Sequence, residues 1–359
     1  MKAKSRIIIL VSLFIFCMMI HLFAQDELRV ENSYSTNIYP KIASILRTSL
    51  GIISFSVGDL IYGIVFGILL YKLIQWIVSF FRTKENKKTI QENVFQLLRI
   101  IMILYLVFNL CWGINYNRKG IAYQTQIAIK DYNADELKTI NELLVEKVNL
   151  TKLKSSGSNL NSISNDELFR EAIRAYHNAS DSFLFLKYDH PSVKSSIWGW
   201  LGNYLGYTGY YNPFTGEAQV NTTIPKTTQP FIVCHEIAHQ LGYAKEKEAN
   251  FVAYLVCRQS NNESFKYAAY LDLFFYANRN LYAFDSVSAK RYRNELNEFV
   301  KKDIKAIVAF NMAHKSKAEP IIAWMYDLFL KGNQQPQGML SYEQVTAYLI
   351  NYYRKFGTI

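Results

Sequence analysis

The stretch FIVCHEIAHQLGYAKEKEANFVAYLVC, residues 231–257, determines what the rest of the chain has to build. Within it His235, Glu236 and His239 form the pattern H-E-x-x-H between apolar neighbours. Residues four apart lie on one face of a helix, so the two imidazoles can share one metal ion. Imidazole suits Zn²⁺, and Glu236 stands where a carboxylate can hold and deprotonate a metal-bound water. Because the chain has only 6 His among 359 residues, a chance match is disfavoured.

A third metal ligand has to come from further along the chain. On a straight helix Glu246 would lie about 10 Å beyond His239 along the axis, too far for one ion. Gly242 allows the chain to turn back, because glycine accepts positive φ and commonly ends helices. A second helix that begins near Lys245 would then bring Glu246 towards the histidines.

Two glutamates compete for the ligand position, Glu246 and Glu248. Glu246 has Asn250 four residues later on its own face, where the amide can hydrogen-bond a ligand imidazole. Glu248 has Val252 in the corresponding place, which cannot form such a bond. We therefore predict Glu246 as the third ligand, with Asn250 as the supporting residue and Glu248 as the alternative.

The first third of the chain predicts a membrane domain, residues 1–118, ahead of a catalytic domain, residues 119–359. The expected spans are residues 7–24, 60–81 and 97–115, with Trp112 and Tyr116 at the outer interface of the last one. The first is either a retained span or a cleaved signal, since Leu22-Phe23-Ala24 has the form of a processing site. Residues 41–57 are either a solvated loop or a short interfacial or re-entrant helix. Lys72 interrupts the second span, and we expect it to snorkel or to face a neighbouring helix.

Positive charges in the short loops predict the orientation of these spans. Lys2, Lys4 and Arg6 precede the first span, and RTKENKK at 82–88 follows the second. Basic loops stay in the cytoplasm, so the N-terminus and residues 82–96 are expected inside, and everything after Asn115 outside. This predicts a multi-pass protein of the cell (inner) membrane whose catalytic domain faces the periplasm, with the lipid bilayer as a partner.

The overall charge does not indicate nucleic acid as a partner. The formal net charge is +11, but much of the excess flanks the apolar segments, and the remaining Lys and Arg are mixed with Asp and Glu. The four Cys lie in apolar segments or in the expected core helices, so free buried thiols are favoured over a disulfide framework.

The rest of the chain predicts a mainly α fold with a small β element. Helical spacing covers residues 131–149, 166–182, 265–282, 288–309, 319–330 and 341–356. Residues 198–220 are rich in glycine, aromatics and turn signals, and predict a β-hairpin just before the H-E-x-x-H helix. Its last strand, Glu217, Ala218, Gln219, Val220 and Asn221, is either an edge strand that holds an extended substrate or a purely structural element.

Four longer motifs resemble signatures of an uncharacterised bacterial membrane-protein family, domain-of-unknown-function family 3810. They are FSVGDLIY at 55–62, CWGINYNR at 111–118, GYYNPFTGEAQVN at 209–221 and HEIAHQLG at 235–242. The resemblance covers nearly the whole chain and implies N-terminal spans followed by a zincin-like α+β domain.

A wider resemblance points to the gluzincin metallopeptidases. The pattern E-x-x-A-N that starts at Glu246 is similar to the E-x-x-A-D and E-x-x-x-D signatures that follow H-E-x-x-H in those enzymes. It implies metal-ligand roles for His235, His239 and Glu246, and a general-base role for Glu236. The interval to Glu246 is shorter than in thermolysin-like enzymes and requires a tight turn at Gly242.

These observations support one leading hypothesis and two alternatives. The leading one is a membrane-anchored zinc metallopeptidase that hydrolyses a protein or peptide substrate. The first alternative is a non-catalytic zinc-binding protein with a sensory or structural role, which would bind metal but cleave nothing. The second is an accessory subunit of a transporter, for which Lys72 and residues 41–57 are the only support.

Overall fold

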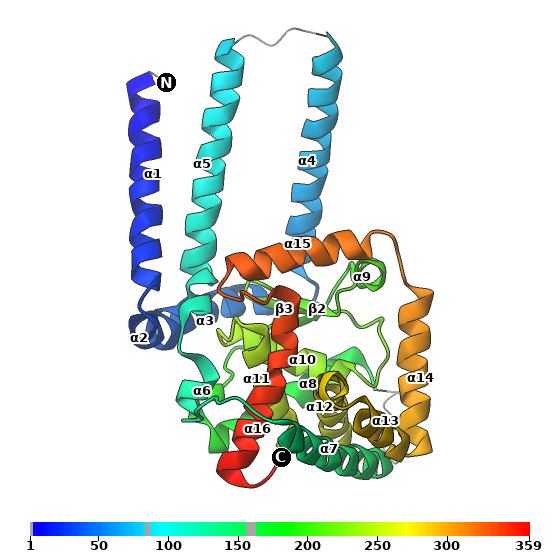
Figure 1. Cartoon of the computed structure of the whole chain (residues 1–359). Helices are drawn as coiled ribbons and strands as arrows, with labels where there is room; N and C mark the ends of the chain where they lie inside the picture. The colour runs from blue at the N-terminus through cyan, green and yellow to red at the C-terminus, as the bar shows by residue number, and fades with distance from the viewer. Residues whose placement is uncertain (1–2, 83–86, 156–162) are drawn as a thin grey trace.

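The computed structural model describes residues 3–82, 87–155 and 163–359, and most of them are helical (Figure 1). The N-terminal elements are α1 (Ala3–Ala24), α2 (Glu27–Arg29), the π-helix η1 (Val30–Ile38), α3 (Tyr39–Gly51), α4 (Val57–Arg82), α5 (Lys87–Cys111), the 3₁₀-helix η2 (Gly113–Asn117) and α6 (Gly120–Gln124). The other elements form a body: α7 (Ala134–Ser155), α8 (Asn165–Ser182), η4 (Leu184–Leu186), β1 (Val193–Ser195), α9 (Gly199–Leu205), β2 (Gly209–Asn212), β3 (Glu217–Val220), α10 (Gln229–Gln240), α11 (Glu246–Arg258), α12 (Glu263–Phe284), α13 (Ser286–Glu295), α14 (Glu298–Ala313), α15 (Glu319–Gly332), η5 (Gly338–Gln344) and α16 (Val345–Phe356).

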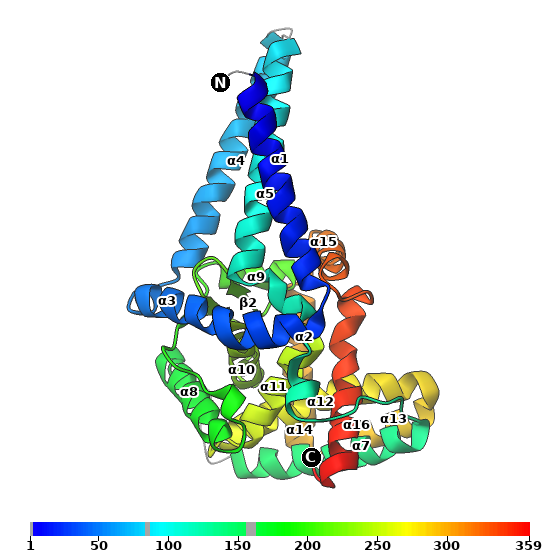
Figure 2. The same cartoon turned by 90° about the vertical axis from the view of Figure 1, so that its left-hand side faces the viewer.

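Helices α1, α4 and α5 extend together from one side of the body (Figures 1 and 2). In the described part of the chain, three segments are long and apolar enough to cross a membrane: Lys4–Ala24, Val57–Gln75 and Gln91–Cys111. Their large apolar side chains are mostly exposed, as lipid-facing residues are. The protein therefore associates with a membrane. Residues 83–86 of the predicted cytoplasmic loop lie outside the described residues.

The predicted third span, 97–115, is wrong at its C-terminal end. Helix α5 ends at Cys111, because the backbone at Trp112 turns to φ −163° and the chain continues in η2. Trp112 and Tyr116, expected at the membrane interface, are buried in the body instead. Their rings stack edge to face with centroids 5.1 Å apart, and Trp112 packs on Tyr211 of β2.

The segment expected at 41–57 contains helix α3 rather than a solvated loop. The helix lies across the bases of α1 and α4 (Figure 2) and packs on the body through one face. Arg47 is buried on that face, 5.1 Å from the ring of Tyr188, while Ile45 on the other face is exposed. The helix therefore lies along the body and does not re-enter the region of the spans.

The β element is a small mixed sheet with strand order β1-β3-β2. The predicted hairpin is present, since β2 and β3 pair antiparallel with Tyr210 opposite Gln219. However, β1 pairs with the other side of β3 in parallel, with Lys194 opposite Gln219. The edge-strand prediction for β3 is therefore wrong: β3 is the central strand and is buried throughout.

The body is a helical core in which α12 packs along α7, and α10 and α11 pack on each other and on α12. Cys234 and Cys257 are buried there as free thiols, as predicted. The helix predicted at 288–309 is divided in two, because the side chain of Asn297 caps a new helix by accepting the N–H of Val300. The cap of α8 is Ser164, so the helix starts at Asn165, one residue before the expected start at 166.

Candidate metal centre

Helix α10 carries the H-E-x-x-H residues in the middle of the body. Every residue from Val233 to Gln240 is buried, so the polar side chains are held by apolar packing on both flanks. The helix ends at Gln240, and Gly242 just beyond it has φ +85°, as the predicted turn requires. A Cβ at Gly242 would come within 2.9 Å of the Tyr39 ring, so a larger residue has no room there.

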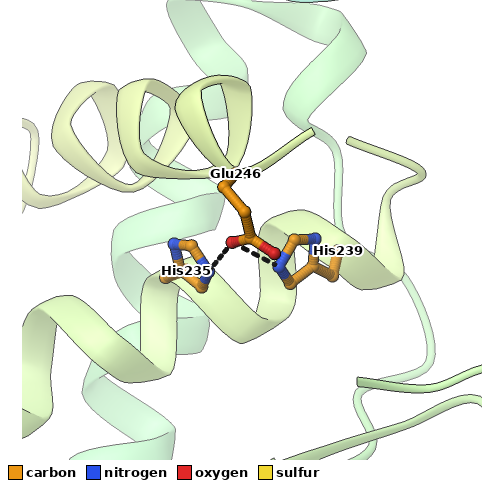
Figure 3. Close-up of side chains that lie close together, drawn as sticks. All are labelled: His235, His239 and Glu246. Carbon is orange, nitrogen blue, oxygen red and sulfur yellow. Dashed lines mark ion pairs between the residues drawn. The ribbon is translucent and has the colours of Figure 1, made fainter. Parts of the chain in front are cut away.

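The turn brings Glu246, at the start of α11, onto the two histidines (Figure 3). Its Oε2 lies 3.2 Å from Nε2 of His235 and 3.5 Å from Nε2 of His239. Ligand atoms about 2.0–2.1 Å from a tetrahedral zinc lie about 3.3–3.4 Å apart. One potential ligand atom from each of the three buried residues lies within 4.8 Å of the other two, so the set fits one ion.

The far nitrogen of each imidazole is held by a second contact. Nδ1 of His235 lies 2.7 Å from Oδ1 of Asn250, the contact predicted from the sequence. Nδ1 of His239 lies 2.7 Å from the carbonyl oxygen of Tyr243. Both oxygens can accept a proton from Nδ1, so Nε2, which faces Glu246 in each ring, is the nitrogen available to a metal ion.

Glu246 is oriented by a tyrosine that the sequence did not single out. The hydroxyl of Tyr326, on α15, donates to Oε1 at 2.6 Å, and the N–H of Glu246 donates to Oε1 of Gln335. Oε2 is buried and faces Nε2 of both histidines, with no other hydrogen-bond partner among the described residues. A carboxylate held by one oxygen, with the other one facing two imidazoles, is suited to bind a cation through that second oxygen. No short sequence pattern links Tyr326 to Glu246, 80 residues earlier.

Glu236 lies beside this cluster as a second buried carboxylate. Burial raises its pKa to about 7, although the nearby His235 and His239 oppose the shift. Its Oε2 has no hydrogen-bond partner among the described residues. Gly209 of β2 faces it, and a Cβ at that position would lie 2.6 Å from Oε1. Glycine thus leaves room around the carboxylate.

The electrostatics of the cluster follow from the same contacts. Burial lowers the pKa of His235, but its hydrogen bond to Glu246 outweighs this and raises the pKa to about 9. Burial raises the pKa of Glu246, yet the positive charges of His239 and His235 bring it below its ordinary range. The cluster therefore favours a negatively charged Glu246 carboxylate beside positive charge, and a divalent ion can supply that charge.

The alternative ligand, Glu248, lies elsewhere. Its carboxylate packs against Gly120, and its Oε1 is 4.0 Å from the Lys245 ammonium. Burial raises its pKa, and the charges of Lys245 and Arg118 counteract the shift. Of the two candidates, the structure brings only Glu246 to the histidines.

The strand considered for substrate binding is buried and makes structural contacts. Glu217 accepts the N–H groups of Val57 and Gly58 at the start of α4 and pairs with Lys194 at 2.6 Å. This carboxylate stabilises the N-terminal end of the helix dipole. The other four residues of the set (Ala218, Gln219, Val220 and Asn221) are buried as well, with Gln219 bonded to Ser56 and Asn221 to Asn203.

The C-terminal end of α10 accepts hydrogen bonds from the N-terminal segments. The indole N–H of Trp112 donates to the carbonyl of His239 at 3.1 Å, and the hydroxyl of Tyr39 donates to that of Gln240 at 2.9 Å. These bonds satisfy carbonyls that the end of a helix leaves without partners.

Arg118 completes this support at the turn itself. Its Nη1 donates to the carbonyl of Gly242 at 3.2 Å, and its Nη2 pairs with Oε1 of Glu31 at 2.8 Å. Both partners of the ion pair are buried. The juxtamembrane segments (residues 30–59 and 112–118) thus hold the turn that creates the metal centre.

The family model described as protein of unknown function (DUF3810) matches residues 34–350. The chain belongs to this family. Comparisons with functionally characterised proteins and with experimentally solved structures gave no match. The DUF3810 match spans η1 to α16, so it includes α4, α5, the metal centre and Tyr326, whereas α1 lies outside it.

Proposed function

We propose that this DUF3810 protein is a membrane-anchored, zinc-dependent metallopeptidase. The observation that carries the proposal is the buried set of two imidazole nitrogens and one carboxylate oxygen, with a second buried carboxylate, Glu236, beside it. Two histidines and a glutamate are the ligand set of one class of catalytic zinc sites, which keep a position open for water or substrate.

Each residue has a distinct part in this proposal. His235, His239 and Glu246 would hold the ion, which when bound polarises a carbonyl and makes a water more acidic. Glu236 would take a proton from the attacking water on its Oε2 and pass that proton to the leaving amine. Asn250 and Tyr326 act as positioning residues, because each contacts a ligand side chain and neither contacts the proposed ion position.

The sheet offers an edge for an extended substrate, but on β2 rather than β3. The N–H of Asn221 donates to the carbonyl of Thr208. In an antiparallel ladder, the backbone N–H and C=O groups of Thr208 and Tyr210 therefore point towards β3, and those of Gly209 point away from it, to the open edge. Gly209 also lies against Glu236. A peptide that paired with this edge would pass directly over the proposed base.

We further propose that the body lies on the periplasmic side of the inner membrane. The support is the distribution of positive charge, with Lys4 and Arg6 in the first turn of α1, at the opposite end of that helix from the body. Reporter fusions after residue 81 and after residue 119 test the orientation. A cytoplasmic reporter that is active at the second point would contradict it.

Activity is tested with the full chain in lipid nanodiscs, loaded with zinc and incubated with a broad peptide library. The wild type should cleave, and Glu236→Gln should keep its zinc while losing cleavage at least about 100-fold, since general-base catalysis contributes about 10²–10⁴-fold. Glu142→Gln, an exposed change on α7, is the matched control. Equal cleavage by Glu236→Gln would contradict the mechanism, and a zinc-loaded wild type that cleaves nothing would favour the non-catalytic alternative.

A further inference from the structure

Helix α15 covers the metal centre. Tyr326 reaches down from it to Glu246, and the ring of Phe329 packs 6.2 Å from Phe108 of α5 and 6.3 Å from Tyr116. The helix thus joins the metal centre to the base of a membrane span.

The opposite face of α15 is apolar and exposed. Ile321, Trp324, Met325 and Leu328 are 60, 62, 56 and 49% exposed. Their spacing places them on one stripe, and at 100° per residue Trp324 and Leu328 lie opposite Tyr326. A stripe of large apolar residues in contact with water is unfavourable, so it indicates a partner surface.

The position of α15 identifies that surface. In both views the helix lies on the side of the body from which α1, α4 and α5 extend (Figures 1 and 2). The neighbouring α9 also exposes large side chains, Trp200, Leu201 and Tyr204. Trp198, just before α9, donates its indole N–H to the carbonyl of Asp59 in the first turn of α4. The apolar surface is therefore continuous with the start of a span.

The composition of this surface matches a membrane interface. Trp and Tyr concentrate at the headgroup level, where an apolar ring and a polar group are both accommodated. Lys315 and Lys317 are exposed just before α15, where they can meet lipid phosphates. A second protein copy would not require this placement beside the spans.

We propose that α15 and α9 form a lipid-seated cover that rests in the headgroup layer of the bilayer crossed by α1, α4 and α5, and that the centre beneath it acts on polypeptide segments emerging from that bilayer. The second part rests on the proposed peptidase function. It follows from the arrangement, because the helix that contacts Glu246 with one face contacts lipid with the other. A membrane-anchored polypeptide is thereby concentrated next to the proposed metal centre, whereas a freely diffusing peptide is not.

The lipid contact is tested by spin labels on the full chain in nanodiscs that contain anionic lipid. Leu328→Cys is labelled in a background with Cys17 and Cys111 changed to Ala, and Val287→Cys on α13, far from the spans, is the matched control. The spin label at position 328 should be accessible to dissolved oxygen and shielded from a water-soluble nickel complex. The label at position 287 should be accessible to the nickel complex. A water-like profile at 328, or dipolar broadening from a second copy, would overturn the lipid contact.

The substrate class is tested with one peptide library in two forms, free or coupled to a dipalmitoyl anchor in the same nanodisc. The wild type should cleave the anchored form at least tenfold faster, and Leu328→Glu should remove this advantage while keeping zinc and the rate on free peptide. Equal rates on both forms with the wild type would overturn the substrate class. Cleavage of neither form would refute the peptidase function and the substrate class with it, while the spin-label result would still decide the lipid contact.

Discussion

The turn between α10 and α11 has two sides that are built differently. On one side lie two buried carboxylate oxygens: Oε2 of Glu236 has no hydrogen-bond partner among the described residues, and Oε2 of Glu246 faces Nε2 of both histidines. On the other side, both juxtamembrane segments donate hydrogen bonds to carbonyls at the end of α10 and in the turn, from Tyr39 in the first segment and from Trp112 and Arg118 in the second.

The paired side supports the turn, and the other side carries the groups that we propose take part in the chemistry. Buried polar atoms normally find partners, and the Glu246 oxygen that faces both imidazoles is the one that the proposed metal binding requires. The paired side holds the turn rigid so that the unpaired side keeps its geometry. The membrane-proximal residues are therefore part of the centre's construction, and a fragment that begins at Lys119 would lack them.

The largest effect is expected from removing a ligand on the unpaired side. His235→Ala should abolish stoichiometric zinc binding in the full chain, measured by elemental analysis after purification. The lost metal should also reduce stability, by about 4 kcal/mol at a zinc concentration 1,000-fold above Kd. The exposed His177→Ala should change neither quantity. Full zinc occupancy in His235→Ala would contradict the ligand assignment.

Arg118→Leu, on the paired side, should destabilise the fold by about 3–5 kcal/mol, because it leaves the Glu31 carboxylate buried without its partner. The measurement is denaturant unfolding of the full chain in detergent. Combining the change with Glu31→Leu should recover much of the loss. If the single variant is as stable as the wild type, the paired side does not support the turn.

A smaller effect is expected at Asn250, which holds a ligand without touching the ion position. Asn250→Ala should weaken zinc affinity about 10–100-fold, as is typical when the residue that orients a ligand histidine is lost. Competition with a chromophoric chelator measures this, with the exposed Asn311→Ala as the matched control. An unchanged Kd would show that Asn250 does not position His235.

The smallest effect is expected from Tyr326→Phe, which removes one hydroxyl and keeps the ring. Zinc affinity should fall by up to about tenfold, since a typical hydrogen bond contributes about 0.5–1.5 kcal/mol net. The same chelator assay applies. A loss greater than that of Asn250→Ala would mean that Tyr326 does more than orient Glu246.

The sequence predicted that His235, His239 and Glu246 lie together, because this prediction depends on local features of the chain. The i, i+4 histidines, the glycine turn and the choice of Glu246 over Glu248 depend on helix periodicity and on one positive φ, which Gly242 supplies. The helical class and the presence of three long apolar segments followed from the same periodicity and from composition.

What the sequence did not predict depends on contacts between distant segments. Trp112 looked like an interfacial residue, because nothing local shows that it bonds to His239, 127 residues later. Strand β1 has only three residues and no strong strand pattern, so the burial of β3 between two neighbours was missed. Tyr326 reaches the centre only through the path of α15 across the body.

The most direct test of the central claim is zinc K-edge absorption spectroscopy on the full chain purified in lipid nanodiscs. We expect about one zinc per chain, bound by two imidazole nitrogens at about 2.0–2.1 Å and by carboxylate oxygen at about 2.0–2.2 Å, with the imidazole signal lost in His235→Ala. A folded wild type that binds no zinc when the metal is supplied, or binds it without imidazole, would contradict the account.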